Sequence, residues 1–168
     1  MTQPLRIGLI GAGMVSRHQL IAWESISDRA RVVAVADPSS ENAARRAAEF
    51  GISQTYTDAE AMLAAVALDA IDIAAPREMH APLVRLAAKH RLPVLCQKPL
   101  APDAAAAAAA VAALSPATRV MVHENWRWRA PYRMLRTALD GGRVARPSRF
   151  ELRVESAGLL ADAQGRRP

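Results

Sequence analysis

The residues whose types and spacing best suit chemistry form a glycine-rich turn near the start of the chain. The pattern G-x-G-x-x-small runs from Gly11 to Ser16, directly after the apolar run 5–10 and before a helical pattern. Gly11 allows a tight turn, Gly13 lets the backbone approach a pyrophosphate, and a small Ser16 lets the helix lie close to the strand. The free N–H groups of the first helical turn and the helix dipole favour phosphate charge. The residues predicted to bind a dinucleotide pyrophosphate are Gly11, Ala12, Gly13, Met14 and Val15.

A carboxylate at the end of the second apolar run supports a dinucleotide site. Asp37 follows the strand-like run 31–36 and lies 24 residues after Gly13. This is close to the spacing of a carboxylate that accepts hydrogen bonds from a ribose 2′-OH. A carboxylate there repels a 2′-phosphate, so the expected cofactor is NAD and NADP is disfavoured. The alternative interpretation is a simple glycine turn, with Asp37 as a helix N-cap before Pro38.

Lys98 is the candidate for proton chemistry. It is the only lysine besides Lys89, since 20 of the 22 basic residues are arginine. Arginine keeps its proton at working pH, whereas lysine loses it when desolvated or placed beside another cation. Lys98, next to Pro99, is therefore a candidate acid/base or substrate-orienting group. A surface lysine before a turn proline fits the residues equally well.

The elements that position these residues alternate regularly between short apolar strands and amphipathic helices. Expected strands are 5–10, 31–36, a short one at Tyr56, 70–75, 92–96 and 119–123. Expected helices start after the glycine turn and run to about 26, then span 39–50, 58–67, 79–90 and 103–114. This alternation predicts an α/β, Rossmann-type doubly wound parallel sheet covered by helices on both faces. Its ligands are expected at the carboxyl ends of the strands, where the glycine turn, Asp37 and Lys98 all fall.

The pattern changes near residue 125, which divides the chain into two expected parts. Residues 1–124 are predicted to form the Rossmann dinucleotide-binding domain. Residues 125–168 are predicted to be the incomplete beginning of an α+β substrate domain, with a helix over 130–141 and a strand over 149–155. A lone amphipathic strand cannot bury its apolar face. We therefore expect this chain to be a truncated or fragmentary version of a longer enzyme.

Composition and charge narrow the function classes. Half the residues (51%) are hydrophobic, and the single cysteine, Cys96, rules out a disulfide framework within the chain, which fits a cytoplasmic protein. The N-terminus lacks the pattern of a signal peptide, and no apolar run reaches membrane-spanning length. The net charge of +6 comes from residues 119–168, but no nucleic-acid motif accompanies it. No acidic or histidine cluster has the spacing of metal ligands, so no metal is expected. From the preceding observations, no nucleic acid or membrane partner is expected either.

These motifs together resemble the glucose–fructose oxidoreductase/inositol dehydrogenase (Gfo/Idh/MocA) family. The resemblance covers about residues 4–155 and includes P-x-x-x-H at Pro76–His80 and C-Q-K-P at Cys96–Pro99. It implies an NAD- or NADP-dependent oxidoreductase of sugars or polyols, with hydride transfer between nicotinamide and a substrate hydroxyl carbon. It also implies that Lys98 is catalytic, and that Pro76, His80 and Gln97 belong to the cofactor site. A homo-oligomer is possible within the family.

Two departures from the family pattern bear on function. Gln97 replaces the glutamate of the E-K-P motif, which removes a charge beside Lys98. The histidine that transfers the proton in family dehydrogenases comes from the second domain, beyond residue 168. The resemblance thus implies that this chain is only the cofactor-binding part, with little turnover by itself. The alternative is a non-catalytic Rossmann-fold nucleotide-binding or sensor protein, or a nonfunctional fragment.

Overall fold

The computed structural model describes residues 3–143, 147–149, 151 and 153. The chain divides into two compact units, Met1–Asn125 and Trp126–Pro168. The first unit contains the sheet and all of its helices. The second contains α6 (Ala130–Asp140), which agrees with the helix expected over 130–141. A 3₁₀ turn, η2 (Asn125–Trp128), spans the boundary. The predicted strand 149–155 falls largely outside the described residues, so the predicted second domain stays a prediction.

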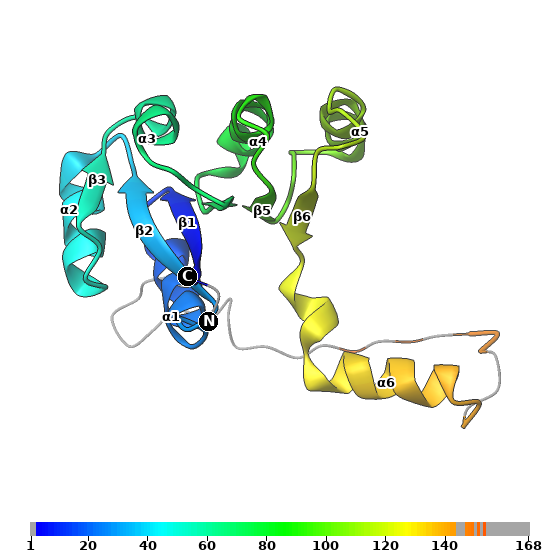
Figure 1. The fold of residues 1–168 in the computed structure, drawn as a ribbon. Coiled ribbons are helices and arrows are strands. Elements are labelled where there is room, and N and C mark those ends of the chain that lie inside the picture. Colours follow the sequence, from blue (N-terminus) through cyan, green and yellow to red (C-terminus); the bar gives the residue numbers. More distant parts are fainter. Residues whose placement is uncertain (1–2, 144–146, 150, 152, 154–168) are drawn as a thin grey trace, which may run out of the picture. The chain divides into compact units, whose positions relative to one another are not determined.

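Six parallel strands form one sheet in the order β3-β2-β1-β4-β5-β6 (Figure 1). The order reverses beside β1, which is the topological switch point of a doubly wound sheet. This confirms the predicted Rossmann-type fold class. The strands are β1 (Leu5–Ile10), β2 (Ala30–Ala36), β3 (Gln54–Tyr56), β4 (Ala70–Ile73), β5 (Val94–Gln97) and β6 (Val120–His123).

Helices lie on both faces of the sheet (Figure 1). All the crossovers are right-handed, so the helices that connect β1, β2 and β3 lie on one face. When the chain returns to β4 and runs across the sheet in the opposite direction, its helices lie on the other face. The first face packs against α1 and α2, and the opposite face against α3, α4 and α5. The helices are α1 (Met14–Glu24), α2 (Ser40–Glu49), α3 (Ala59–Ala65), α4 (His80–Lys89) and α5 (Ala104–Ala112), with a 3₁₀ turn η1 (Arg77–Met79) before α4. Within the described part of the chain, no helix is both long and apolar enough to cross a membrane.

Alternation along the strands divides the core into two clusters. Ile71 and Ile73 of β4 pack with Leu83 and other residues of α4. Leu9 of β1 packs with residues of α1 and α2 on the other face. Since neighbouring strand residues point to opposite faces, the residue between the two isoleucines, Asp72, faces the α1 side. A carboxylate is thereby buried beneath α1.

Local signals set most helix starts as expected. Ser39, Asp58 and Asp103 are N-caps whose side chains accept hydrogen bonds from main-chain N–H groups three residues later. Several predicted boundaries were wrong by two residues. The first helix ends at Glu24, the helix after Asp103 ends at Ala112, and the strand expected from 92 begins at Val94. The helix after Asp58 ends at Ala65, and the strand expected over 70–75 ends at Ile73.

Gly11 lies against the backbone just after the end of β4. Gly11 has φ +99°, and a Cβ added to it would lie 2.6 Å from the main-chain nitrogen of Ala75 and 2.7 Å from the carbonyl carbon of Ala74. The turn after β1 therefore lies directly against the backbone that leaves β4. A left-handed conformation and a main-chain collision both restrict this position to glycine.

We expect Gly11→Ala to destabilise the protein far more than Gly51→Ala. Gly51 also has positive φ, +63°, but its added Cβ meets nothing within 4 Å. Its substitution should cost only the left-handed strain, about 1–2 kcal/mol. Gly11→Ala should cost roughly 3–5 kcal/mol, because the main chain of β4 must also move. Urea unfolding of both variants measures the difference, and equal losses would contradict the close approach.

Candidate functional site

The glycine turn places an open surface at the start of α1. Gly13 is the N-cap of α1, with φ −71° and ψ −166°, and an added Cβ would meet no described atom within 4 Å. Gly13 is therefore not required by packing, in contrast to Gly11. The side chains that follow are unusually exposed for apolar residues, at 78% for Met14 and 38% for Val15. The free N–H groups of the first helical turn thus lie beside accessible space, which suits an anion.

Asp37 joins this turn to the end of β2. Its Oδ2 accepts a hydrogen bond from the main-chain N–H of Ala12 at 2.7 Å, and its Oδ1 accepts one from Ser39 at 2.9 Å. The helix N-cap is Ser39, so the interpretation of Asp37 as the N-cap was wrong. Each carboxylate oxygen keeps a further lone pair, so the side chain can hold the loop and still accept from a ribose hydroxyl.

Lys98 is exposed at the end of β5, and its neighbour fixes its backbone. The side-chain oxygen Oε1 of Gln97 accepts a hydrogen bond from the main-chain N–H of Lys98 at 2.8 Å. A glutamate could make the same contact through a carboxylate oxygen. The replacement of glutamate by Gln97 therefore removes charge but keeps the hydrogen bond that orients the Lys98 main chain. The Lys98–Pro99 peptide bond is cis.

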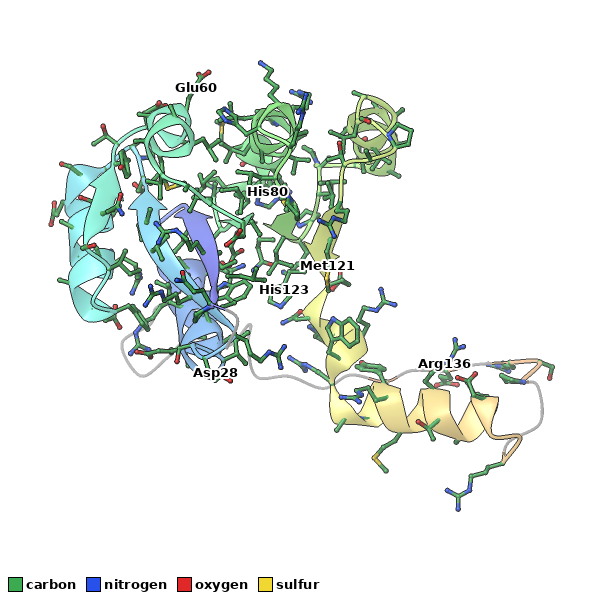
Figure 2. All side chains as sticks on the ribbon, in the orientation of Figure 1. Asp28, Glu60, His80, Met121, His123 and Arg136 are labelled. Carbon is green, nitrogen blue, oxygen red and sulfur yellow. The ribbon has the colours of Figure 1, made fainter. Side chains whose placement is uncertain are left out.

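His80 connects the loops that follow β4 and β5. Its ring is 1% exposed, with Nδ1 2.6 Å from the carbonyl oxygen of Pro99 and Nε2 2.8 Å from that of Ala75 (Figure 2). The ring thereby links the loop next to Gly11 to the loop that carries Lys98. Pro76 follows Ala75 in the chain and is the N-cap of η1. The roles of Pro76 and His80 toward a cofactor stay predictions.

A pocket of about 510 Å³ lies between α1 and the carboxyl ends of β5 and β6. It brings Lys98 and Gln97 to the same cavity as residues that sequence reasoning had not grouped with them. His123, at the end of β6, is one of these (Figure 2). The lining residues are Val15, His18, Gln19, Ala22, Trp23, Ile26, Asp72, Leu95, Gln97, Lys98, His123 and Asn125.

Asp72 is the most unusual member of this pocket. Its side chain is 0% exposed, and its Oδ2 accepts a hydrogen bond from Trp23 Nε1 at 2.7 Å. Its Oδ1 is buried without a hydrogen-bond partner among the described residues, as are the amide atoms of Gln19 and Nδ1 of His123. Burial raises the pKa of Asp72 to about 6, against the opposing effect of the Trp23 hydrogen bond. The signal in the sequence that could have found it is its place between Ile71 and Ile73 in an apolar strand, which indicates a buried carboxylate.

The thiol and the acidic residues do not add a second chemistry. Cys96 is buried on the α4 side of the sheet, where burial raises its pKa to about 12, so it stays a protonated core residue. Over the described residues, no three histidine, cysteine, aspartate or glutamate side chains gather as metal ligands.

Known proteins are similar to the part of this chain that contains the sheet and the candidate site. A family described as "Oxidoreductase family, NAD-binding Rossmann fold" matches residues 5–125. The chain is 44% identical over 140 residues to a D-apiose dehydrogenase of Paraburkholderia graminis, covering 83% of this chain and 37% of the relative. It is 35% identical over 149 residues to an inositol 2-dehydrogenase of Streptomyces avermitilis, covering 88% and 43%.

A solved structure is similar over the same span. An oxidoreductase from Agrobacterium radiobacter, in complex with NAD+, L-tartaric acid and magnesium, superposes with a TM-score of 0.81 at 35% identity. The match covers 87% of this chain and 42% of that one. The chain thus spans about two fifths of the length of these relatives.

We expect Asp72→Asn to stabilise the protein above pH 6. The pKa of Asp72 is about 6 in the folded protein, compared with an ordinary value of 3.8. Between these two pH values the folded state therefore binds more protons than the unfolded state. The wild type therefore loses stability as pH rises from about 4 to 6, on the order of 2–3 kcal/mol. Asparagine stays neutral and can still accept from Trp23, so its advantage should grow through this window.

Urea unfolding at pH 4, 5, 6 and 7 measures this advantage. The exposed Asp28 provides a control, because Asp28→Asn removes a carboxylate that has no burial cost. If the difference in free energy of unfolding between wild type and Asp72→Asn does not change with pH, the interpretation of Asp72 as a buried carboxylate that binds a proton is contradicted.

Proposed function

We propose that this chain binds NAD as the cofactor part of a dehydrogenase, because it belongs to the oxidoreductase family with an NAD-binding Rossmann fold. The observation that carries the proposal is the open space over Gly13 at the N-terminus of α1, beside the Asp37 carboxylate. Relatives named as D-apiose and inositol dehydrogenases support a sugar or polyol as the substrate class. The proposed reaction removes hydride from a substrate carbon that bears a hydroxyl.

The residues fit such a cofactor. The N–H groups of Gly13, Met14 and Val15 would donate to the pyrophosphate, aided by the positive end of the helix dipole. Asp37 would accept hydrogen bonds from the adenosine ribose. Its negative charge opposes a 2′-phosphate, so the proposal is NAD in preference to NADP. NAD, when bound, supplies the hydride acceptor of the reaction.

Lys98 is the proposed catalytic residue of this chain. Its ammonium can orient the substrate hydroxyl and donate a proton to the substrate oxygen, whereas its neutral amine would accept the hydroxyl proton when the substrate is oxidised. Gln97 holds the Lys98 main chain, and His80 holds the carbonyl of Pro99. The pocket next to Lys98 has room for the reacting groups, at about 510 Å³. Pro76, His80 and Gln97 are proposed as supports of the cofactor site.

The second candidate is a nucleotide-binding protein without catalysis. The observation that favours it is Gln97, which stands where the family has glutamate and removes a charge beside Lys98. In both cases we propose a cytoplasmic protein that needs no nucleic acid partner. The two candidates share the cofactor site and differ in turnover.

The first test is titration of the purified chain with NADH and NADPH, followed by energy transfer from tryptophan to nicotinamide. We expect tighter binding of NADH. Gly13→Val should weaken it by at least about a hundredfold, because the side chain fills the space where the backbone approaches the phosphate. The melting temperature should fall by only a few degrees, since no described atom lies within 4 Å of the added Cβ.

Gly13→Ala is the matched smaller change and should fall between wild type and Gly13→Val. Equal NADH affinity in wild type and Gly13→Val would refute the pyrophosphate site. Tighter binding of NADPH would refute the role of Asp37 in cofactor choice.

A second test separates the two candidate functions. The purified chain is assayed for NAD reduction with D-apiose and with myo-inositol, and Lys98→Ala is the matched variant. We expect both forms to bind NADH equally and the wild type to turn over slowly, because the pocket at Lys98 is open to solvent, but measurably faster than Lys98→Ala. Equal background rates in the two forms would favour the non-catalytic candidate.

A further inference from the structure

Arg46 is a buried arginine behind the glycine turn, and no part of the proposed mechanism yet uses it. It lies on α2 and is 3% exposed. Its Nε donates to Ser16 Oγ at 3.1 Å, and its Nη2 donates to the carbonyl oxygen of Gly13 at 3.0 Å. Its Nη1 pairs with Glu49. Arginine is rarely buried to this extent unless its donors are paired, and here two of three contacts go to the predicted cofactor loop.

The contact with Gly13 fixes the direction of a main-chain donor. The carbonyl oxygen of Gly13 receives Arg46 and also the Ser16 hydroxyl, which donates at 2.6 Å. In a planar trans peptide, the C=O and the following N–H point in opposite directions. The N–H of Met14 therefore points away from Arg46. It belongs to the first helical turn, whose N–H groups have no partner within the helix.

The charges around Arg46 add to the same effect. Glu49 pairs with both Arg17 and Arg46, and these partners, Arg17 first, hold the pKa of Glu49 below its ordinary value. One carboxylate thus faces two guanidinium groups, so the cluster of Arg17, Arg46 and Glu49 is net positive. The first turn of α1 contains no acidic residue, and the Asp37 carboxylate contacts the glycine turn separately, at the N–H of Ala12. A positive field at a helix N-terminus favours an anion.

We infer that Arg46 is a positioning residue for the dinucleotide pyrophosphate, acting through the Gly13 carbonyl and Ser16 to aim the main-chain N–H groups of the turn. Ser16 stands where glycine or alanine is usual, and its hydroxyl both accepts from Arg46 and donates to Gly13. This inference rests on the proposed cofactor site and deepens it. Arg46 itself touches no substrate or cofactor atom in this role.

The test compares Arg46→Met with Arg45→Met in the whole chain. Arg45 is the adjacent arginine on α2, is exposed, and donates a hydrogen bond to the side chain of Asn42 at 2.9 Å. The ligands are ADP-ribose, which carries the pyrophosphate, and adenosine, which carries the same first ribose without phosphate. Affinities are measured by ligand-observed NMR and by competition with NADH, and stability by thermal unfolding.

We expect Arg46→Met to weaken ADP-ribose binding by about tenfold or more, as for the loss of charge-assisted hydrogen bonds. Adenosine affinity should change by less than about twofold, and Arg45→Met should leave both ligands unaffected. Arg46→Lys keeps the charge but not the planar fork, so it should recover only part of the ADP-ribose affinity. Ser16→Ala should also weaken ADP-ribose selectively and serves if Arg46→Met does not fold.

The outcomes are distinct for the two proposals. A folded wild type that binds neither NADH nor ADP-ribose would refute the proposed function. The positioning role alone would be refuted if the wild type binds both ligands and the Arg46→Met and Ser16→Ala variants bind ADP-ribose with the same affinity as Arg45→Met. Equal weakening of ADP-ribose and adenosine by Arg46→Met would also refute it, because that result indicates a general structural effect.

Discussion

The contact of Gly11 with the main chain that leaves β4 is the constraint on which the rest of the site depends. An added Cβ would lie 2.6 Å from the nitrogen of Ala75, so the two loops meet without a side chain between them. This contact lies at the point where the strand order reverses. It allows the loops after β1 and β4 to share one edge of the sheet. His80 then extends the same edge to the loop of Lys98 through its contacts with Ala75 and Pro99.

The glycine turn is held from two sides, each with a different consequence. Asp37 receives the N–H of Ala12, which joins the turn to β2 and uses part of the carboxylate. Arg46 holds the carbonyl of Gly13 from α2, which directs the neighbouring N–H groups outward. Rigid support of this kind stabilises a binding loop before the ligand arrives, so less ordering accompanies binding. The open surface at Gly13 is therefore a preorganised surface.

The α1 side of the sheet combines apolar packing with unpaired polar atoms. Asp72 accepts from Trp23 through one oxygen, while its other oxygen is buried without a described partner. Such an atom costs stability unless a donor reaches it. The raised pKa of Asp72 follows from this cost, because protonation removes the buried charge. The same pocket includes Lys98, so the buried Asp72 carboxylate and the proposed catalytic residue line one cavity.

The sequence by itself determined the elements and the loops on which the candidate site residues lie. Apolar runs, caps such as Ser39 and Asp58, and the glycine spacing are local signals, and they predicted the parallel sheet and the places of Gly11, Asp37 and Lys98. Tertiary structure alone decided which distant residues meet these loops. Arg46 reaches Gly13 across 33 residues, and Trp23 reaches Asp72 across 49, because α2 and α1 pack against that face. Periodicity shows which face of a helix is buried, but the packing of one element against another decides which polar atom that face meets.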